Sequence, residues 1–520
     1  MNQPLHRWRA VGTGLLAGVL AAVIMTLVML LLTWSFGMAT PLTIIGDRIS
    51  AFIPPGPFLA LMGRVGGYNH LKQLGVSGTI IGQVLVGAIV GLGYGLTIRR
   101  RGKFSLILTL AVFFLLPLIG SILLLGPVLG TSYRGYPITP ATTITLFGLA
   151  LSFLVFERTL VWSYRYLTVG RRSPNELEYS PALGRRALLL GGLGLLFAGG
   201  GVAILRRLCQ VATFAYDGTQ YKGAEVQPIT PNEKFYCVTK NVIDPRVDQR
   251  IWRLEVTGLV KNPQSYSIAQ IKSLPSVTQE TTLMCISNGL DAGLMSNAVW
   301  RGVPLSEFLH AASLSPDAAR VRLHGVDNYT DTFSLEKAME PTTIIAYEMN
   351  GQRLPDRHGF PARAIVPGYF GEKNVKWLTR IELAGAGAKG FYEKQGWGPN
   401  FVIPTRARID QPDNYAWFRL TTLPDGIAVK GVAFSGDRGV SRVEVSTDGE
   451  ESWQEARIDY PGTRLTWVLW SFDWKPNEPG EYDLTVRATD GRGEAQQFDR
   501  DRSPFSGITG LHKITVYLDA

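Results

Sequence analysis

Three changes of pattern along the sequence predict a multi-domain protein: an N-terminal α-helical membrane region, an α+β domain and a C-terminal all-β sandwich. Residues 1–210 contain long apolar runs with few charges, and residues 217–400 alternate strand-like and helix-like stretches. From residue 408 to residue 520, apolar and polar residues alternate with a period of two, as in half-buried strands. A chain of 520 residues is long enough for these three parts.

Five apolar runs in the first part are long enough to cross the roughly 30 Å hydrocarbon core of a bilayer. They cover residues 11–34, 76–98, 104–129, 141–162 and 187–205, and the last is glycine-rich and less hydrophobic. Buried helices of a soluble protein would be shorter and would carry polar faces. We therefore expect a membrane region of about five spans.

The formal net charge of +10 belongs to the apolar part of the chain. Residues 1–210 hold 18 Lys and Arg against 4 Asp and Glu, whereas the rest holds 34 against 38. This distribution argues against nucleic-acid binding and instead predicts orientation, because basic residues in short loops stay in the cytoplasm. With a cytoplasmic N-terminus, five crossings place everything after about Arg207 on the extracytoplasmic (periplasmic) side of the cell membrane.

Two details bear on the role of the membrane region. Arg185 and Arg186 directly precede the fifth run, where they are either a pair of stop charges or an internal twin-arginine export signal.

The runs contain no histidine, since His6 and His70 lie outside them, so a b-type haem would lack axial ligands there. We therefore expect an anchor or docking surface, not an electron carrier.

Turn and strand patterns divide the rest of the chain. The α+β domain is predicted by a strand at 251–256 and by short helices at 267–273, 305–312 and 335–340. Residues 385–405 are expected to form a linker. An immunoglobulin-like sandwich, without the Cys…Trp…Cys core of antibody domains, is predicted by strands at 427–432, 442–446, 482–487 and 512–518.

The segment 281–305 is the strongest candidate for chemistry. It places Cys285 at the end of a short apolar run, before a glycine-containing loop, and Trp-Arg-Gly-Val-Pro-Leu follows at 300–305. A free cysteine is often a small buried hydrophobe, but a thiol at a strand end can also bind a metal. The chain has only two other cysteines, Cys209 and Cys237, which are too few for a disulfide framework. It contains no Cys-x-x-Cys pair, so the usual sequence patterns of a structural zinc site and of an iron–sulfur cluster are missing.

These residues resemble the cysteine segment of the sulfite oxidase family of molybdenum enzymes, where the thiolate binds molybdenum and Trp-x-Gly-Val-Pro-Leu follows. Three further stretches match that family in the same order: Ile-Thr-Pro-Asn through Thr-Lys-Asn at 229–241, Tyr-Glu-Met-Asn-Gly at 347–351, and His-Gly-Phe-Pro-Ala-Arg through Val-Lys-Trp-Leu at 358–378. Four motifs in order make the resemblance specific. It implies a sulfite-oxidase-like molybdopterin domain and a dimerisation domain after it.

The resemblance further implies a molybdenum–molybdopterin cofactor and the residues that would hold it. Cys285 would be the metal ligand and a catalytic residue, and Tyr329 would donate to the oxygen being transferred. Cofactor contacts would also come from the other matched positions, Lys240, Asn241, Asp327, His358, Arg363, Glu372, Lys373 and Asn374. Singly, such residues are more often capped histidines, salt-bridged arginines or solvated turn charges, so it is their shared order with Cys285 that favours function.

One feature departs from the family. Sulfite oxidases carry arginines just after the ligand cysteine, which hold the sulfite dianion, whereas this loop reads Asn288-Gly289-Leu290-Asp291. An aspartate would repel a dianion. The substrate is therefore left open between a small oxyanion, a sulfur compound and a sulfoxide-like molecule.

The sequence thus predicts a membrane-anchored molybdopterin oxidoreductase that carries out two-electron oxygen-atom transfer outside the cytoplasm. Its partners would be a small-molecule substrate, a separate cytochrome-like protein or quinone-linked redox partner, and a second copy bound through the C-terminal domain. The alternative is a non-catalytic membrane-anchored binding protein that has kept the fold and lost the metal. A transporter is disfavoured, because charged residues are nearly absent from the spans.

Overall fold

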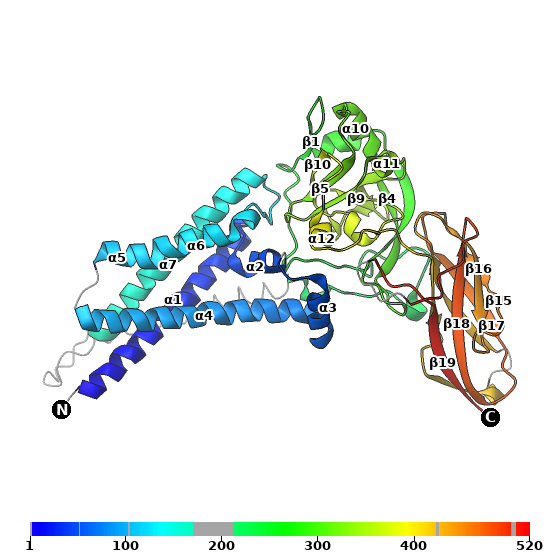
Figure 1. Cartoon of the computed structure of the whole chain (residues 1–520), viewed down its shortest axis with the longest axis horizontal. Helices are drawn as coiled ribbons and strands as arrows, with labels where there is room; N and C mark the ends of the chain where they lie inside the picture. The colour runs from blue at the N-terminus through cyan, green and yellow to red at the C-terminus, as the bar shows by residue number, and fades with distance from the viewer. Residues whose placement is uncertain (1–2, 51, 102–104, 170–211, 423–425, 501–505) are drawn as a thin grey trace. The chain divides into compact units, whose positions relative to one another are not determined.

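The structure of the chain is a computed structural model that describes residues 3–50, 52–101, 105–169, 212–422, 426–500 and 506–520 (Figure 1). It forms two compact units. The first comprises Met1–Phe52, Ala60–Ala215 and Lys240–Asp244. The second comprises Ile53–Leu59, Tyr216–Thr239 and Pro245–Ala520.

Long apolar helices build the first unit (Figure 1). Four stretches are long and apolar enough to cross a membrane: Val11–Phe36 in α1 (Gln3–Phe36), Tyr68–Ile98 in α4 (Tyr68–Arg101), Leu106–Val128 across α5 (Leu106–Leu110) and α6 (Leu116–Leu125), and Ile138–Thr168 in α7 (Ile138–Val169). A π-helical turn, Ala111–Leu115, joins α5 to α6. The four stretches correspond to four of the five predicted runs. The fifth run, 187–205, and the Arg185-Arg186 pair lie outside the described residues.

Glycines allow α1 and α4 to pack closely. A Cβ atom added to Gly14 would lie 2.5 Å from the carbonyl oxygen of Gly91, and one added to Gly18 would meet the backbone of Gly87 even more closely. The two glycines on each helix are four residues apart, which is the spacing that lets membrane helices bring their backbones together. Between α1 and α4 in the sequence lie two short helices, α2 (Pro41–Ser50) and α3 (Pro55–Arg64).

Gly18→Leu is expected to destabilise the helical unit by about 1–3 kcal/mol, because a larger side chain has no space against the α4 backbone. The measurement is the thermal unfolding midpoint of the full chain in detergent. Gly12→Leu is the matched control on the same helix, since nothing lies within 4 Å of a Cβ added there. Equal midpoints for the two variants would contradict the packing of α1 on α4.

The second unit begins with an α+β domain that contains two sheets. The first has the strand order β2-β1-β10-β5-β6, with β1 and β10 parallel. The second has the order β3-β4-β7-β8, with β9 paired to β7. The strands are β1 (Leu254–Gly258), β2 (Gln264–Tyr266), β3 (Val277–Met284), β4 (Met295–Pro304), β5 (Arg320–Gly325), β6 (Thr330–Ser334), β7 (Ile344–Met349), β8 (Gln352–Arg353), β9 (Arg363–Ile365) and β10 (Leu378–Ala384).

The helices of this domain agree with the sequence. α9 (Ile268–Ser273), α10 (Leu305–Ala312) and α11 (Leu335–Met339) occupy the three predicted positions. The strand predicted at 251–256 begins later, because the backbone N–H of Trp252 bonds to the carbonyl of Asp248 and closes a turn there. The predicted linker at 385–405 contains one short helix, α12 (Phe391–Lys394).

A two-sheet β-sandwich forms the C-terminal part, as predicted. Its sheets have the orders β11-β13-β17-β16 and β12-β19-β18-β14-β15. Their buried faces share one core, which includes Val429, Trp470, Val443, Val486 and Val516. The strands are β11 (Arg406–Gln411), β12 (Ala416–Arg419), β13 (Ile427–Phe434), β14 (Val440–Ser446), β15 (Gln454–Glu455), β16 (Arg457–Tyr460), β17 (Val468–Trp474), β18 (Gly480–Asp490) and β19 (His512–Asp519). The immunoglobulin-like description stays a prediction.

Candidate active site

Cys285 follows directly after β3, at the start of the loop that leads to β4. Its backbone N–H donates to the carbonyl of Leu294 at 3.0 Å, which closes the loop at its base. The thiol is half-buried and free, and its Sγ lies 3.2 Å from Ser287 Oγ. Burial raises the pKa of this thiol to about 11, and Ser287 partly opposes the shift. The sulfur therefore stays a thiol until a cation stabilises the thiolate, as a bound metal does.

A second loop reaches Cys285 through a glycine. A Cβ atom added to Gly371 would lie 2.7 Å from Tyr236 Oη and 3.8 Å from Cys285 Cα. The next residue is Glu372, and both of its buried carboxylate oxygens lack a hydrogen-bond partner within the described residues. Burial, followed by the nearby charge of Asp331, raises the pKa of Glu372 to about 8. An unpartnered buried carboxylate is costly unless another group bonds to it.

Tyr329, which was predicted at the substrate, faces the same loop. Its Oη lies 2.8 Å from Asp331 Oδ2 and 3.2 Å from the carbonyl oxygen of Glu372, and its backbone N–H donates to Asp327. Burial, reinforced by the charge of Asp331, raises the pKa of Tyr329 well above its usual value. The phenol therefore keeps its proton and acts as a donor.

A buried ion pair between Lys373 and Asp331 holds the Tyr329 hydroxyl, because Asp331 also accepts a hydrogen bond from it. Lys373 Nζ lies 2.6 Å from Asp331 Oδ1, with the two side chains 2% and 1% exposed. Burial raises the pKa of Asp331, and the charge of Lys373 opposes that shift. The Lys373 charge is therefore balanced inside the protein. This geometry lets Lys373 position Asp331 and Tyr329, and its predicted role as a cofactor contact stays a prediction.

Basic groups lie on another side of the candidate site. The buried guanidinium of Arg363 donates to the carbonyls of His358 at 3.1 Å and Asn374 at 3.2 Å, and it lies 5.0 Å from the Trp300 ring centroid. Lys376 Nζ donates to the Arg357 carbonyl at 3.1 Å. Among the described residues, no ion pair joins Arg363 or Lys376 to an acid. These two cations donate to neutral carbonyls and have no acidic partner among the described residues, so they are suited to bind a phosphate or another anionic group.

His358 lies beside these cations and is neutral. Its Nε2 is 3.0 Å from the carbonyl oxygen of Asn232, so this nitrogen carries the proton and donates. Burial lowers the pKa of His358 to about 3, and the charges of Lys376 and Arg363 act in the same direction. The other ring nitrogen, Nδ1, can then accept a hydrogen bond from a bound group.

The remaining predicted residues take different roles. Asn374 uses its side chain on the backbone, because Oδ1 accepts from Val366 N at 2.7 Å and Nδ2 donates to the carbonyl of Phe370. Lys240 and Asn241 belong to the first compact unit, whereas Cys285 belongs to the second. Their role as cofactor contacts stays a prediction.

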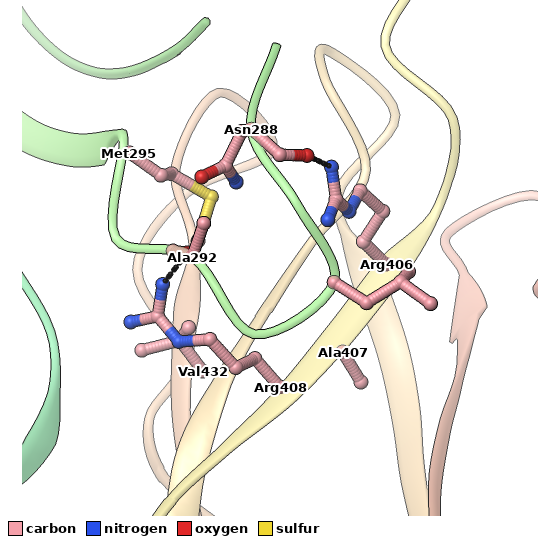
Figure 2. Close-up of a pocket in the computed structure, with 8 residues that line it drawn as sticks. Asn288, Ala292, Met295, Arg406, Ala407, Arg408 and Val432 are labelled. Carbon is pink, nitrogen blue, oxygen red and sulfur yellow. Dashed lines mark hydrogen bonds between the residues drawn. The ribbon is translucent and has the colours of Figure 1, made fainter. Parts of the chain in front are cut away.

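Two arginines from the sandwich, not predicted as site residues, hold the loop after Cys285 (Figure 2). Arg406 donates to the carbonyls of Asn288 at 2.8 Å and Gly289 at 2.6 Å. Arg408 donates to the Ala292 carbonyl at 2.6 Å and pairs with Asp410. Both line a small pocket beside the loop. Burial lowers the pKa of Arg406 to about 10.

Arg406→Met is expected to destabilise the protein by about 1.5–3 kcal/mol, because two loop carbonyls lose a charged donor. The readout is the apparent unfolding midpoint in urea. Arg457→Met removes an exposed arginine of the same sandwich that pairs with Asp459, and should change stability much less, because solvent screens an exposed ion pair. Similar losses in both variants would argue against a special role for Arg406.

The donor set fits a molybdopterin group. Cys285 offers a soft sulfur ligand, Arg363 and Lys376 offer charge for a phosphate, and Glu372 offers an unused carboxylate to pterin N–H groups. Together with the α+β fold, this combination defines a molybdopterin-binding domain followed by a β-sandwich.

Comparison with known proteins identifies the family. The model described as the oxidoreductase molybdopterin binding domain matches residues 241–392, and that of the Mo-co oxidoreductase dimerisation domain matches residues 400–510. Sulfite oxidase of Arabidopsis thaliana is 30% identical over 285 residues, which cover 45% of this chain and 71% of that protein. The chain belongs to the sulfite oxidase family of molybdopterin oxidoreductases.

Other relatives share less of their length. Mitochondrial sulfite oxidase of Rattus norvegicus is 32% identical over 312 residues, which cover 50% of this chain and 56% of that enzyme. Nitrate reductase of Hordeum vulgare is 29% identical over 324 residues, which cover 50% of this chain and 36% of that enzyme. Among solved structures, the sulfane dehydrogenase SoxCD of Paracoccus pantotrophus has a TM-score of 0.50 at 22% identity, covering 57% of this chain and 85% of that one. This last likeness supports the fold.

Proposed function

We propose that this protein is a membrane-anchored molybdopterin oxidoreductase that transfers an oxygen atom to or from a small sulfur- or oxyanion-type substrate outside the cytoplasm. The observation that carries the proposal is the free thiol of Cys285, which faces a loop with an unpartnered buried carboxylate at Glu372. When bound, the molybdenum–molybdopterin group would supply the two-electron chemistry. This chain would bind and orient that group.

The chain's own residues then have separate tasks. Cys285 would hold the metal, and Arg363, Lys376 and neutral His358 would hold the anionic part of the cofactor. Tyr329 donates its single hydroxyl proton to Asp331, so it would donate to a substrate oxygen only by exchanging that bond for one to the substrate. Lys373 and Asp331 would hold the Tyr329 hydroxyl in place.

Substrate choice rests on the loop after Cys285. That loop carries Asp291, and the nearby arginines, Arg406 and Arg408, donate to its carbonyls. The negative charges of Asp291 and of Asp410, which pairs with Arg408, therefore oppose a free dianion here, which disfavours sulfite relative to a less charged substrate. The domain match over residues 400–510 supports a homodimer through the sandwich. Electrons would pass to or from a separate cytochrome-like or quinone-linked partner.

The predicted orientation rests on the basic residues of the short loops, which would keep the N-terminus in the cytoplasm and place the catalytic domain outside it. The fifth span that this orientation requires, at 187–205, lies outside the described residues.

The test uses the full-length chain, purified in detergent from a host that makes molybdopterin. We expect about one molybdenum and one pterin per chain, and turnover of a sulfur or oxyanion compound with an artificial electron acceptor or donor. A reporter fused after Ala520 that works only outside the cytoplasm tests the orientation. Absence of molybdenum would favour the alternative, a binding protein that has lost the metal.

A further inference from the structure

A short helix from the predicted linker packs against the candidate site. α12 begins after Gly390, and a Cβ atom added to Gly390 would lie 2.5 Å from Asp331 Oδ1, so a larger residue has no space there. Glu393, on the same helix, accepts from the Gly390 backbone N–H at 2.7 Å and from the Thr332 hydroxyl. These contacts fix the Glu393 carboxylate beside strand β6, which carries Asp331 and Thr332.

The same carboxylate ends a series of polar side chains that begins at Tyr329. Tyr329 Oη lies 2.8 Å from Asp331 Oδ2, and Lys373 Nζ lies 2.6 Å from Asp331 Oδ1. On its other side, Lys373 Nζ lies 3.8 Å from Glu393 Oε2. The side chains of Lys373 and Asp331 are 2% and 1% exposed, whereas that of Glu393 is 15% exposed. The series therefore runs from a phenol in the candidate site to a carboxylate that contacts water.

Charge balance alone does not require this approach of Glu393 to Lys373. Asp331 already balances Lys373, and Arg320 pairs with Glu393 at 2.9 Å. Each pair is neutral by itself, yet the two pairs lie side by side and link the site to the surface. The arrangement therefore calls for a role besides stability.

Each member of the series can take up and give up a proton. Tyr329 donates its own proton toward Asp331, so its oxygen can accept another proton from the site. The Lys373 ammonium carries three donors and can release one as it receives another. Burial alone would raise the pKa of Glu393, but the hydrogen bonds that it accepts and the neighbouring cations lower it. Glu393 is therefore ionised and able to accept a proton.

Oxygen-atom transfer moves protons as well as electrons. Addition of an oxygen atom from water to a substrate releases two protons and two electrons, and removal of that oxygen as water takes up the same. The electrons would pass to or from the separate redox partner. The protons need acid–base groups that reach from the site to water.

We propose that four side chains form a proton path between the candidate site and the surface: Tyr329, Asp331, Lys373 and Glu393. Outward, the Tyr329 oxygen takes up a proton from the site as its own proton passes to Asp331. Lys373 passes one of its protons to Glu393 as it receives one from Asp331, and Glu393 releases its proton to water. Only O–H and N–H bonds form and break, and every group returns to its starting state. Uptake of protons runs in the reverse order. This path rests on the proposed function for the reaction that it serves.

The first experiment follows the Tyr329 hydroxyl in the full-length protein in detergent, without substrate. In an equal mixture of H₂O and D₂O, the NMR signal of a tyrosine labelled with ¹³C at Cζ is split when its hydroxyl exchanges slowly and single when exchange is fast. Tyr329→Phe identifies the signal. We expect a single signal in the natural protein and a split one in Glu393→Gln, because exchange should slow by about tenfold or more.

Arg320→Gln is the matched control, since it removes the ion-pair partner of Glu393 and keeps the acid. Its Tyr329 signal should stay single. Lys373→Arg keeps the buried charge but should split the signal, because an arginine does not release its proton in proteins. In turnover, Glu393→Gln should lower kcat by about tenfold with little change in KM, and should raise the solvent deuterium isotope effect on kcat.

The outcomes separate the path from the proposed function. If Glu393→Gln keeps a single Tyr329 signal, the path is wrong and the proposed function stands. If Arg320→Gln splits the signal as Glu393→Gln does, a local disturbance is the cause and the path is again wrong. A natural protein without molybdenum would overturn the proposed function, while the exchange measurement would still decide whether the path exists. Should Glu393→Gln fail to fold, a single signal in Lys373→Arg would overturn the path by itself.

Discussion

Cys285→Ser should abolish stable molybdenum binding and with it oxygen-atom transfer. A serine hydroxyl has a far higher pKa than a thiol and stays protonated, so it would not offer the metal the anionic ligand that the Cys285 thiolate would provide. Because loss of an indirect partner already costs roughly 10- to 100-fold in metal affinity or activity, loss of the direct ligand should cost more. Metal content per chain and turnover of the best substrate are the two measurements.

Cys237→Ser is the matched control for this substitution. Cys237 is also a buried cysteine, and its Sγ lies 3.9 Å from Lys376 Nζ, a contact that a hydroxyl can keep. We expect Cys237→Ser to retain molybdenum and activity close to the natural levels. If Cys285→Ser bound molybdenum and turned over as before, Cys285 could not be the ligand and the proposed site would be wrong.

Local patterns allowed much of the fold and one side of the site to be predicted. The two-residue period after residue 408 predicts the sandwich, because alternation reports directly on which face of a strand is buried. Cys285, His358 and Arg363 were predicted as site residues from their resemblance to the sulfite oxidase family, and their roles stay predictions. Helix α7 (Ile138–Val169) extends past the predicted apolar run at 141–162, because a helix can continue beyond its apolar window.

The rest of the site depends on contacts that no local pattern reports. Arg406 reaches the loop after Cys285 from more than a hundred residues away. One signal was visible, since Arg406, Arg408 and Asp410 alternate on one face of β11 where apolar residues would be expected in a sandwich core. The pairing of Lys373 with Asp331 had no such signal, because each residue alone resembles a charge in a surface turn.

Asp331→Asn, which breaks the buried ion pair with Lys373, should destabilise the catalytic domain by about 3–5 kcal/mol. The substitution leaves the Lys373 ammonium buried, with Glu393 Oε2 at 3.8 Å as its nearest acid, and an uncompensated buried charge is far more costly than a lost surface pair. The double variant Asp331→Asn with Lys373→Met should recover part of the loss, because it removes both charges. Urea unfolding of the full-length protein in detergent measures both.

Glu225→Gln serves as the comparison, since Glu225 and Lys234 form an exposed pair at 2.5 Å whose loss should cost about 1 kcal/mol or less. If Asp331→Asn unfolded at the same urea concentration as Glu225→Gln, the pair would not be buried as described. Turnover adds a second criterion, because Asp331 also accepts from the Tyr329 hydroxyl. A double variant that regains stability but not the catalytic rate would separate the two tasks of Asp331, balancing Lys373 and orienting Tyr329 toward the substrate.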